Sequence, residues 1–214
     1  KDIYSFLEKS CKKNKKISFF KFSNSRKKIE ELNRNYNLII NSEINNIITK
    51  KYFYSKITKN YNSIAYTLNI KHKKLDNEEA CQIFTKFGPL AFLPISDTET
   101  SIVLSYKGKK KLSIKDLKDF VNKYNNKYKI KSFTSYQFKP LKMKLLRNYY
   151  YKNFLCFGDV LHTIHPLAGQ GLNMTIRDIK ILLDIIKKKI VLGIELNSDV
   201  AENFEKKTKH LNFI

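Results

Sequence analysis

The sequence contains few of the residues that form turns, linkers and covalent cross-links. Its 214 residues include six glycines, four prolines, three cysteines and no tryptophan. The cysteines are Cys11, Cys81 and Cys156, which are widely spaced and form no C-x-x-C pair. This spacing argues against a disulfide framework and against a structural zinc site. We therefore expect a reducing, cytoplasmic compartment.

Long apolar runs are also absent. No stretch reaches the roughly 18 apolar residues that span a bilayer, because the longest candidate, residues 179–194, is interrupted by Lys187, Lys188 and Lys189. The opening KDIYSFLEKS has no signal-peptide pattern and does not begin with Met. We therefore expect the chain to be a piece of a longer protein.

Acidic residues and arginines are scarce beside lysine. Lys and Arg number 42 against 19 Asp and Glu, which gives a formal net charge of +23. Abundant lysine, asparagine and isoleucine with little arginine is typical of AT-rich coding, so we expect solvated lysines and no specific nucleic-acid partner. The charge also favours peripheral association with an anionic membrane surface.

Hydrophobic periodicity predicts an α/β start, an antiparallel β middle and an α/β finish. Helices are expected over residues 2–12, 113–125 and 172–189, followed by a last helix capped by Ser198 or Asp199. Strands are expected over 17–22, 36–40, 63–72, 81–87, 89–95, 101–108, 132–146 with a break at Pro140, and 153–159. Asp97–Thr100 is expected to connect a hairpin.

Residues 156–178, CFGDVLHTIHPLAGQGLNMTIRD, concentrate special backbone chemistry. They hold three of the six glycines and two of the four histidines. An apolar strand ends at Gly158 and Asp159, and a glycine-rich loop then opens a helix. Ligands of open α/β sheets lie at the carboxyl ends of strands, and helix N-termini favour negative charge. The order therefore predicts a ligand site.

Each part of the segment has an expected role in that site. Gly158 permits a tight turn, and the Asp159 carboxylate can accept hydrogen bonds from sugar-like hydroxyls. The main-chain N–H groups of residues 169–171 can contact a flat polar edge of the ligand. Leu172 and Asn173 are expected to start the helix whose dipole faces that edge.

Other site chemistries fit the segment less well. Asp159, His162 and His165 have a D-x-x-H-x-x-H spacing that metal ligands use, but Pro166 disrupts a helix that would align them, so we expect no metal. Cys156 lies in the apolar strand and is expected to be core rather than a nucleophile. We expect His162 to pack or to form a local hydrogen bond, and His165 to face the ligand. The catalytic group is not identified.

GDVLHTIHPLAGQGLNMTIRD resembles the second flavin-contacting motif of the ubiquinone-biosynthesis hydroxylases, whose pattern is approximately GDAAHTxHPxAGQGLNxGxRD. These are FAD-dependent hydroxylases of the p-hydroxybenzoate hydroxylase class. FTKFGPLAFLPISDTETSIVLSY, at 84–106, is similar to the family's F-x-x-x-GPLAxLPL stretch. YNLIINSEINNIITKK is less similar to the family's G-A-D-G-x-x-S-x-x-R, since Glu43 and Ile44 stand for Asp and Gly. The fingerprint G-x-G-x-x-G is absent.

The resemblance implies an α/β (α+β) fold in which an FAD-binding domain is interrupted by a mostly antiparallel substrate domain. Residues 1–53 would be the later part of the FAD-binding domain, 54–145 the substrate domain, and 146–214 the return to the FAD-binding domain. The N-terminal part and the C-terminal end of the complete protein would be missing. The fragment alone is expected to bind FAD poorly and to be inactive.

The implied activity is hydroxylation of the aromatic ring of a prenylated phenol in ubiquinone biosynthesis. It would use FAD, NAD(P)H and O2 through a C4a-hydroperoxyflavin. Partners would include a ubiquinone-biosynthesis complex at the inner membrane. The alternatives are another flavoprotein of the same fold, an epoxidase or reductase, or a non-catalytic basic module that binds nucleic acid or membrane through lysine-rich segments such as 107–129.

The resemblance also implies which residues contact the cofactor and the substrate. Asp159 would hold the ribityl or phosphate-proximal region of FAD, and residues 169–173 would hold the pyrimidine edge of the ring. His165, Leu93 and Pro94 would face the substrate. The implied cofactor residues are Gly158, Asp159, Pro166, Gly169, Gln170, Gly171, Leu172 and Asn173.

Overall fold

The computed structural model describes residues 2–21, 26–108, 110–164 and 170–212. The helices are α1 (Asp2–Lys13), α2 (Arg26–Asn35), α3 (Ile47–Tyr52), α4 (Ile114–Tyr124), α5 (Gln170–Val191) and α6 (Ser198–Asn212), with a 3-10 turn η1 (Gly158–Val160). The strands are β1 (Ile39–Asn41), β2 (Lys56–His72), β3 (Cys81–Thr85), β4 (Gly88–Ser96), β5 (Glu99–Lys107), β6 (Ile130–Leu146), β7 (Tyr150–Tyr151), β8 (Phe154–Cys156) and β9 (His162–Thr163).

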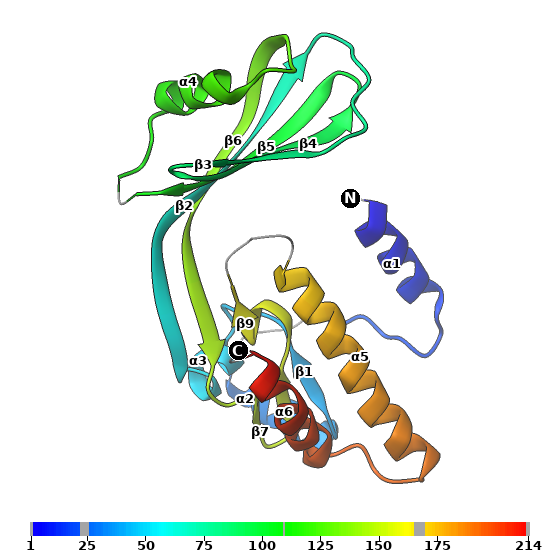
Figure 1. Cartoon of the computed structure of the whole chain (residues 1–214). Coiled ribbons are helices and arrows are strands. Elements are labelled where there is room, and N and C mark those ends of the chain that lie inside the picture. The colour runs from blue at the N-terminus through cyan, green and yellow to red at the C-terminus, as the bar shows by residue number, and fades with distance from the viewer. Residues whose placement is uncertain (1, 22–25, 109, 165–169, 213–214) are drawn as a thin grey trace.

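A six-stranded sheet in the order β3-β4-β5-β2-β6-β9 forms the middle of the chain. Its neighbouring strands are all antiparallel, as the alternating sequence pattern predicts. The connection from β4 to β5 turns at residues 97–98, which confirms the expected hairpin. β2 and β6 each have 17 residues and extend below the rest of the sheet as a two-stranded stem (Figure 1).

One face of this sheet is covered by α4. The helix begins as expected at a capping box, in which Asp116 N donates to Ser113 Oγ over 3.1 Å and Ser113 N donates to the Asp116 carboxylate over 3.2 Å. Leu117 and Val121 of α4 are fully buried against the sheet. The opposite face is turned toward α5 and α6 (Figure 1).

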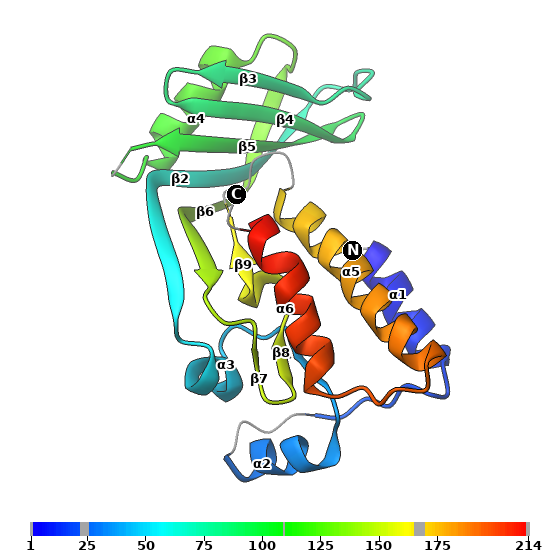
Figure 2. The same ribbon diagram turned by 60° about the horizontal axis from the view of Figure 1, so that its bottom comes forward.

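A three-stranded sheet in the order β1-β8-β7 lies at the foot of the stem. β1 and β8 are parallel, so their carboxyl ends meet at one edge. A hydrophobic cluster separate from the one between α4 and the large sheet surrounds this small sheet. It includes buried residues of β8, α5 and α6, such as Leu155, Leu182 and Phe204. Figure 2 shows α5 and α6 side by side over it. The domain limits 1–53, 54–145 and 146–214 stay predictions.

Four sequence-based expectations need correction. Residues 17–21 form no strand, since no strand lies beside them among the described residues and Phe20 is 82% exposed.

The expected break at Pro140 is absent, and β6 continues through this residue. Proline is tolerated because β9 pairs only with Lys144 and Leu145, so the outer edge of β6 is open at Pro140. α5 begins at Gln170, two residues before the expected start. Asn197, rather than Ser198 or Asp199, accepts the capping bond from the α6 backbone.

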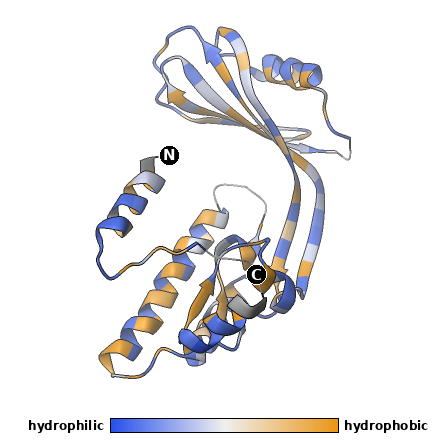
Figure 3. Ribbon diagram, turned by 180° about the vertical axis from the view of Figure 1, so that it is seen from behind, coloured by the Kyte–Doolittle hydropathy of each residue, from blue (hydrophilic) through white to orange (hydrophobic). Residues whose placement is uncertain are grey.

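Charged and apolar residues are widely distributed over the surface. Lysines occur on every helix from α1 to α6, a pattern of solvated faces rather than of one basic stripe. Along α5, Leu172, Ile176, Ile179 and Leu183 are exposed at a spacing of three or four residues, which puts them on one face of the helix. Figure 3 shows apolar segments along this helix. Among the described residues, no helix is both long and apolar enough to span a bilayer.

Candidate functional site

The predicted strand-end site lies where β1 and β8 end together. Asn41 and Cys156 are register partners, and Phe157 N donates a hydrogen bond to Asn41 O over 3.0 Å. The turn after β1 and the turn after β8 therefore lie side by side at one edge of the small sheet. This is the edge at which ligands of parallel α/β sheets bind.

Gly158 makes the turn after β8. Its φ of +65° lies in the left-handed region, which glycine adopts without steric cost. A Cβ added here would meet no atom of the described residues within 4 Å, so on their side the space beside the backbone is open to a ligand. Asp159 follows in η1 with an exposed side chain. The sequence prediction therefore places a carboxylate beside an open turn, and its contact with a cofactor stays a prediction.

Asparagine side chains, rather than glycines, build the turn after β1. The Asn41 amide donates to Thr49 Oγ1 over 2.8 Å, and the Asn46 amide donates to Asn41 Oδ1 over 2.6 Å. Thr49 N donates to Asn46 Oδ1 over 2.8 Å, which caps α3. Glu43 and Ile44 are both exposed on this turn. The altered G-A-D-G segment thus forms an ordered turn without the glycines of the family pattern.

The start of α5 is the second part of the predicted site. Gln170, Gly171, Leu172 and Asn173 form the first turn, whose N–H groups have no partner within a helix. The turn carries no acidic residue, and a Cβ at Gly171 would meet no atom within 4 Å from the part of the chain that the structure describes. α5 also contacts η1, the 3-10 turn that includes Gly158 and Asp159.

Three predicted site residues lie outside the described residues. They are His165, Pro166 and Gly169. Their neighbours Ile164 and Gln170 mark the two ends of that segment. The roles assigned to these three residues stay predictions.

Two cavities meet at Ile164. The stem-side cavity, of about 650 Å³, lies between the stem and the ends of α5 and α6, and Gln170 and Asn173 line it. The sheet-side cavity, of about 420 Å³, lies on the sheet face away from α4, with Thr67 and Gln137 in its lining. Both volumes suit small organic ligands. The sequence did not reveal these linings, because strands far apart in the chain contribute them.

Leu93 and Pro94 lie on β4, away from the lining of both cavities. Leu93 is 39% exposed and is paired with Ser101, whereas Pro94 is paired with the buried Thr100. Side chains alternate between the two faces of a strand, so Leu93 shares the open face with the sheet-side cavity and Pro94 faces the α4 side. Contact of either residue with a substrate stays a prediction.

His162 forms a buried hydrogen bond that holds β9 against α5. Its Nε2 donates to Asp178 Oδ2 over 2.8 Å, and both side chains are 0% exposed. Arg177 donates to Asp178 Oδ1 from Nε over 3.0 Å and from Nη2 over 2.7 Å. Arg177 also donates to Asn212, whose amide donates to Tyr149 OH over 3.0 Å. The expected local hydrogen bond of His162 is confirmed, while the roles of Arg177 and Asp178 were missed.

The two less favoured site chemistries differ in what the structure can test: Cys156 is described, whereas His165 of the D-x-x-H-x-x-H spacing lies outside the described residues. Cys156 is buried, and burial raises the pKa of its thiol to about 12, which keeps it protonated at neutral pH. It is a core residue rather than a nucleophile. Within the described residues, no cluster of three or more His, Cys, Asp or Glu side chains could hold a metal ion.

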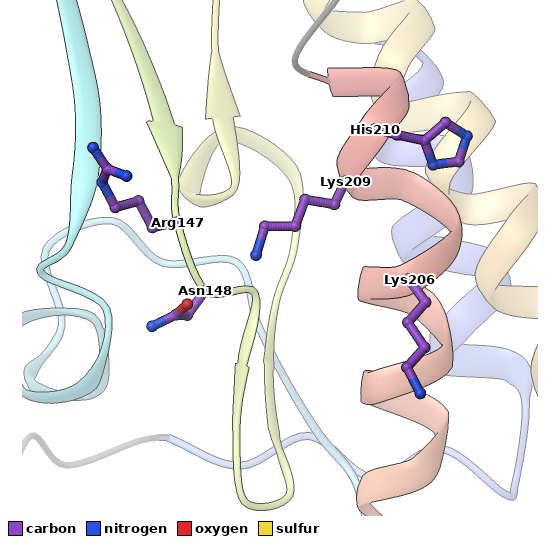
Figure 4. A pocket seen from close by; sticks show the side chains of 5 residues that line it. All are labelled: Arg147, Asn148, Lys206, Lys209 and His210. Carbon is purple, nitrogen blue, oxygen red and sulfur yellow. The ribbon is translucent and has the colours of Figure 1, made fainter.

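A third hollow, of about 700 Å³, lies between the β6–β7 turn and α6. Basic side chains line it, but Figure 4 shows Arg147 and His210 pointing away from each other, with only Lys209 directed between strand and helix. Lys209 is also paired with Glu205 over 2.5 Å. We assign no ligand to this hollow, because its cations do not converge on one point.

Known proteins show both sequence and structural similarity to the chain. A family model described as squalene epoxidase matches residues 48–214. The 3-demethoxyubiquinol 3-hydroxylase of Escherichia coli K12 is 32% identical over 115 residues, which are 49% of this chain and 28% of that protein. The mitochondrial ubiquinone biosynthesis monooxygenase COQ6 of Xenopus tropicalis is 27% identical over 195 residues, which are 71% of this chain and 40% of that protein.

Solved structures agree on the fold. The myxobacterial FAD-dependent halogenase CndH superposes with a TM-score of 0.62 at 12% identity, over 80% of this chain and 43% of the halogenase. The chain spans less than half the length of the two curated relatives described above. The resemblance read from the 156–178 segment and the expected fold class are both confirmed. The chain belongs to the squalene epoxidase family, is related to the ubiquinone-biosynthesis hydroxylases, and has the p-hydroxybenzoate-hydroxylase-like fold.

Proposed function

We propose that the complete protein is an FAD-dependent monooxygenase that hydroxylates the aromatic ring of a prenylated phenol in ubiquinone biosynthesis. One observation carries the proposal. Gly158, with open space beside its backbone among the described residues, and the exposed Asp159 lie at the carboxyl edge of two parallel strands, and α5 packs against this turn. The names of the relatives, a ubiquinol hydroxylase and a ubiquinone biosynthesis monooxygenase, support the reaction class.

The residues at this edge fit FAD. Gly158 and Gly171 each leave open space where any side chain would begin, so a flat group can approach both backbones. Asp159 supplies a carboxylate for the ribityl hydroxyls. The free N–H groups of the first turn of α5 would hold the pyrimidine edge, and the helix dipole there favours negative charge on it. Gly169 and Pro166 would complete the loop.

FAD, when bound, supplies the activation of O2. The overall reaction replaces one ring hydrogen with a hydroxyl group, while NAD(P)H gives a hydride and the second oxygen atom leaves as water. The chain's own residues bind and orient. The substrate ring would lie in the sheet-side cavity, which Ile164 of the predicted flavin segment helps to line. The apolar lining around Val103 and Leu141 would exclude water from the ring.

Partners and place in the cell follow from the same proposal. The substrate would be a prenylated phenol, and its long apolar tail would be drawn from a membrane by a peripherally bound enzyme. The net charge of +23 supports attraction to anionic lipids. Assembly with other ubiquinone-biosynthesis proteins and the choice between NADH and NADPH belong to this proposal.

Product analysis tests the proposed function. The complete protein, as encoded by its gene, is incubated with FAD, NADH or NADPH and a short-chain prenylphenol under isotope-labelled O2. We expect NAD(P)H oxidation coupled to a product that carries one labelled oxygen atom on the ring. NAD(P)H oxidation without a labelled product, or labelled oxygen on the prenyl double bond, would contradict ring hydroxylation; the second result would favour an epoxidase.

A further inference from the structure

The sheet-side cavity is a shallow depression with long side chains at its edge. Val103, Thr67 and Gln137 are register partners in one row across β5, β2 and β6, and Ala65 and Lys139 lie in the next row. All five line the cavity, so they share the face away from α4. Because Ala65 and Thr67 are short while Gln137 and Lys139 are long, the floor lies low and the polar groups stand on the β6 side.

The charged side chains that line the sheet-side cavity are both lysines. Lys139 and Lys142 line it, and no carboxylate does so among the described residues. Within the part of the chain that the structure describes, the exposed Gln137 amide and Lys139 ammonium have no protein partner and can contact water. A ligand that supplied an oxygen anion would therefore replace water at an ammonium and an amide donor without breaking a bond inside the protein.

We propose that Lys139 selects aromatic ligands that carry an anionic oxygen, a carboxylate or a phenolate, and that Gln137 donates a hydrogen bond to the same end of the ring. This inference rests on the proposed function for the placement of an aromatic ring in the cavity. The apolar side chains of Val103 and Leu141 contact the ring, and Ile164 closes the side nearest α5. Lys139 is exposed, so its contribution is modest and sensitive to salt.

Calorimetric binding of three probes to the complete protein tests the inference. The probes are 4-hydroxybenzoate, its uncharged analogue 4-hydroxybenzamide, and 4-nitrophenol above and below its own pKa. We expect the anionic form of at least one acid to bind about fivefold tighter than its neutral counterpart. A preference for benzoate over benzamide identifies a carboxylate as the selected group. A gain on ionisation of nitrophenol identifies a phenolate.

Variants on one strand assign the preference to a residue. Lys139→Met should abolish it and Lys139→Arg should retain it. Lys131→Met, an exposed lysine of β6 outside the cavity lining, should leave it unchanged. A preference that survives in Lys139→Met, one that is also lost in Lys131→Met, no preference in the wild type, or no measurable binding of any probe at millimolar concentration would each overturn the proposal.

Failure of this inference can be distinguished from failure of the proposed function. FAD retention is read from the visible spectrum of every variant, and Lys139→Met should retain as much FAD as the wild type. A protein that retains FAD but shows no anion preference contradicts only the inference. A protein without FAD contradicts the proposed function, while its ligand preference can still be measured.

Discussion

The Nε2 atom of His162 lies 2.8 Å from the Asp178 carboxylate, and neither side chain is exposed to solvent. A carboxylate oxygen only accepts, so the proton of this bond is on Nε2. His162 begins β9, shortly before the segment 165–169 that lies outside the described residues, and Asp178 lies two turns into α5, beyond that segment. The pair therefore fixes the two ends of the predicted flavin loop relative to each other.

Removing the charge of Asp178 should destabilise the fold. In Asp178→Asn, the side chain keeps only one accepting oxygen, so it cannot accept from both Arg177 and His162, and the buried site loses its negative charge. We expect a loss of about 2–4 kcal/mol in the free energy of unfolding, measured by urea denaturation. Asp184→Asn, an exposed position on the same helix, should change it by less than about 0.5 kcal/mol. Equal effects of the two variants would refute the network.

The cysteines should react with iodoacetamide according to their burial. Cys156 is buried and its pKa is raised to about 12, so it remains a thiol and is inaccessible at neutral pH. Cys81 is exposed and should be alkylated in the native protein. In urea both should react. Peptide mass spectrometry measures the result, and native labelling of Cys156 at the rate of Cys81 would contradict its place in the core.

The asparagine-built turn after β1 can be tested through its cap. Asn46→Ala removes both the acceptor for Thr49 N and the donor to Asn41 Oδ1, and the side chain is only 6% exposed. We expect a loss of about 1–2 kcal/mol in the free energy of unfolding. Asn45→Ala changes the preceding exposed asparagine and should have little effect. If both variants unfold at the same urea concentration as the wild type, the turn does not depend on this network.

The capping box of α4 predicts a pH dependence. The hydrogen bonds from Ser113 hold the pKa of Asp116 below its ordinary value of 3.8. A carboxyl group whose pKa is lowered by folding stabilises the fold above that value and loses its effect as the pH falls through the lower folded pKa. The difference in unfolding free energy between wild type and Ser113→Ala should therefore be fully present at neutral pH and shrink below pH 3.8. A difference that grows on acidification would show that the box does not operate.

The sequence predicted those elements whose pattern is local. The alternation in 63–72 and 101–108, the Ser113 cap and the periodicity after Leu172 are each set by neighbouring residues, and the structure contains β2, β5, α4 and α5. The sequence-based prediction was wrong where the structure depends on a neighbouring strand that is distant in the sequence. Residues 17–21 have strand-forming side chains but no strand beside them, and Pro140 is tolerated because one side of β6 is open.

The candidate site could likewise be predicted only where its residues are neighbours in the sequence. Gly158, Asp159 and the start of α5 are contiguous or nearly so in the sequence, and their glycines give a local signal. No local signal marks Asp178 or Gln137, because an aspartate within a helix and a glutamine within a strand are usually solvated. Their roles follow from the register of β2 with β6 and from the packing of α5 against β9.

Retention of FAD by the complete protein is the most direct test of the account. After incubation with FAD and desalting, the visible spectrum should show flavin absorption. Gly171→Leu, which fills the open space at the start of α5, should weaken FAD binding at least about tenfold at an unchanged unfolding midpoint. Lys180→Leu, an exposed position further along α5, should bind FAD normally. A wild type that never acquires flavin absorption, or a Gly171→Leu variant that binds FAD as tightly as the wild type, would contradict the claim that this backbone holds the flavin.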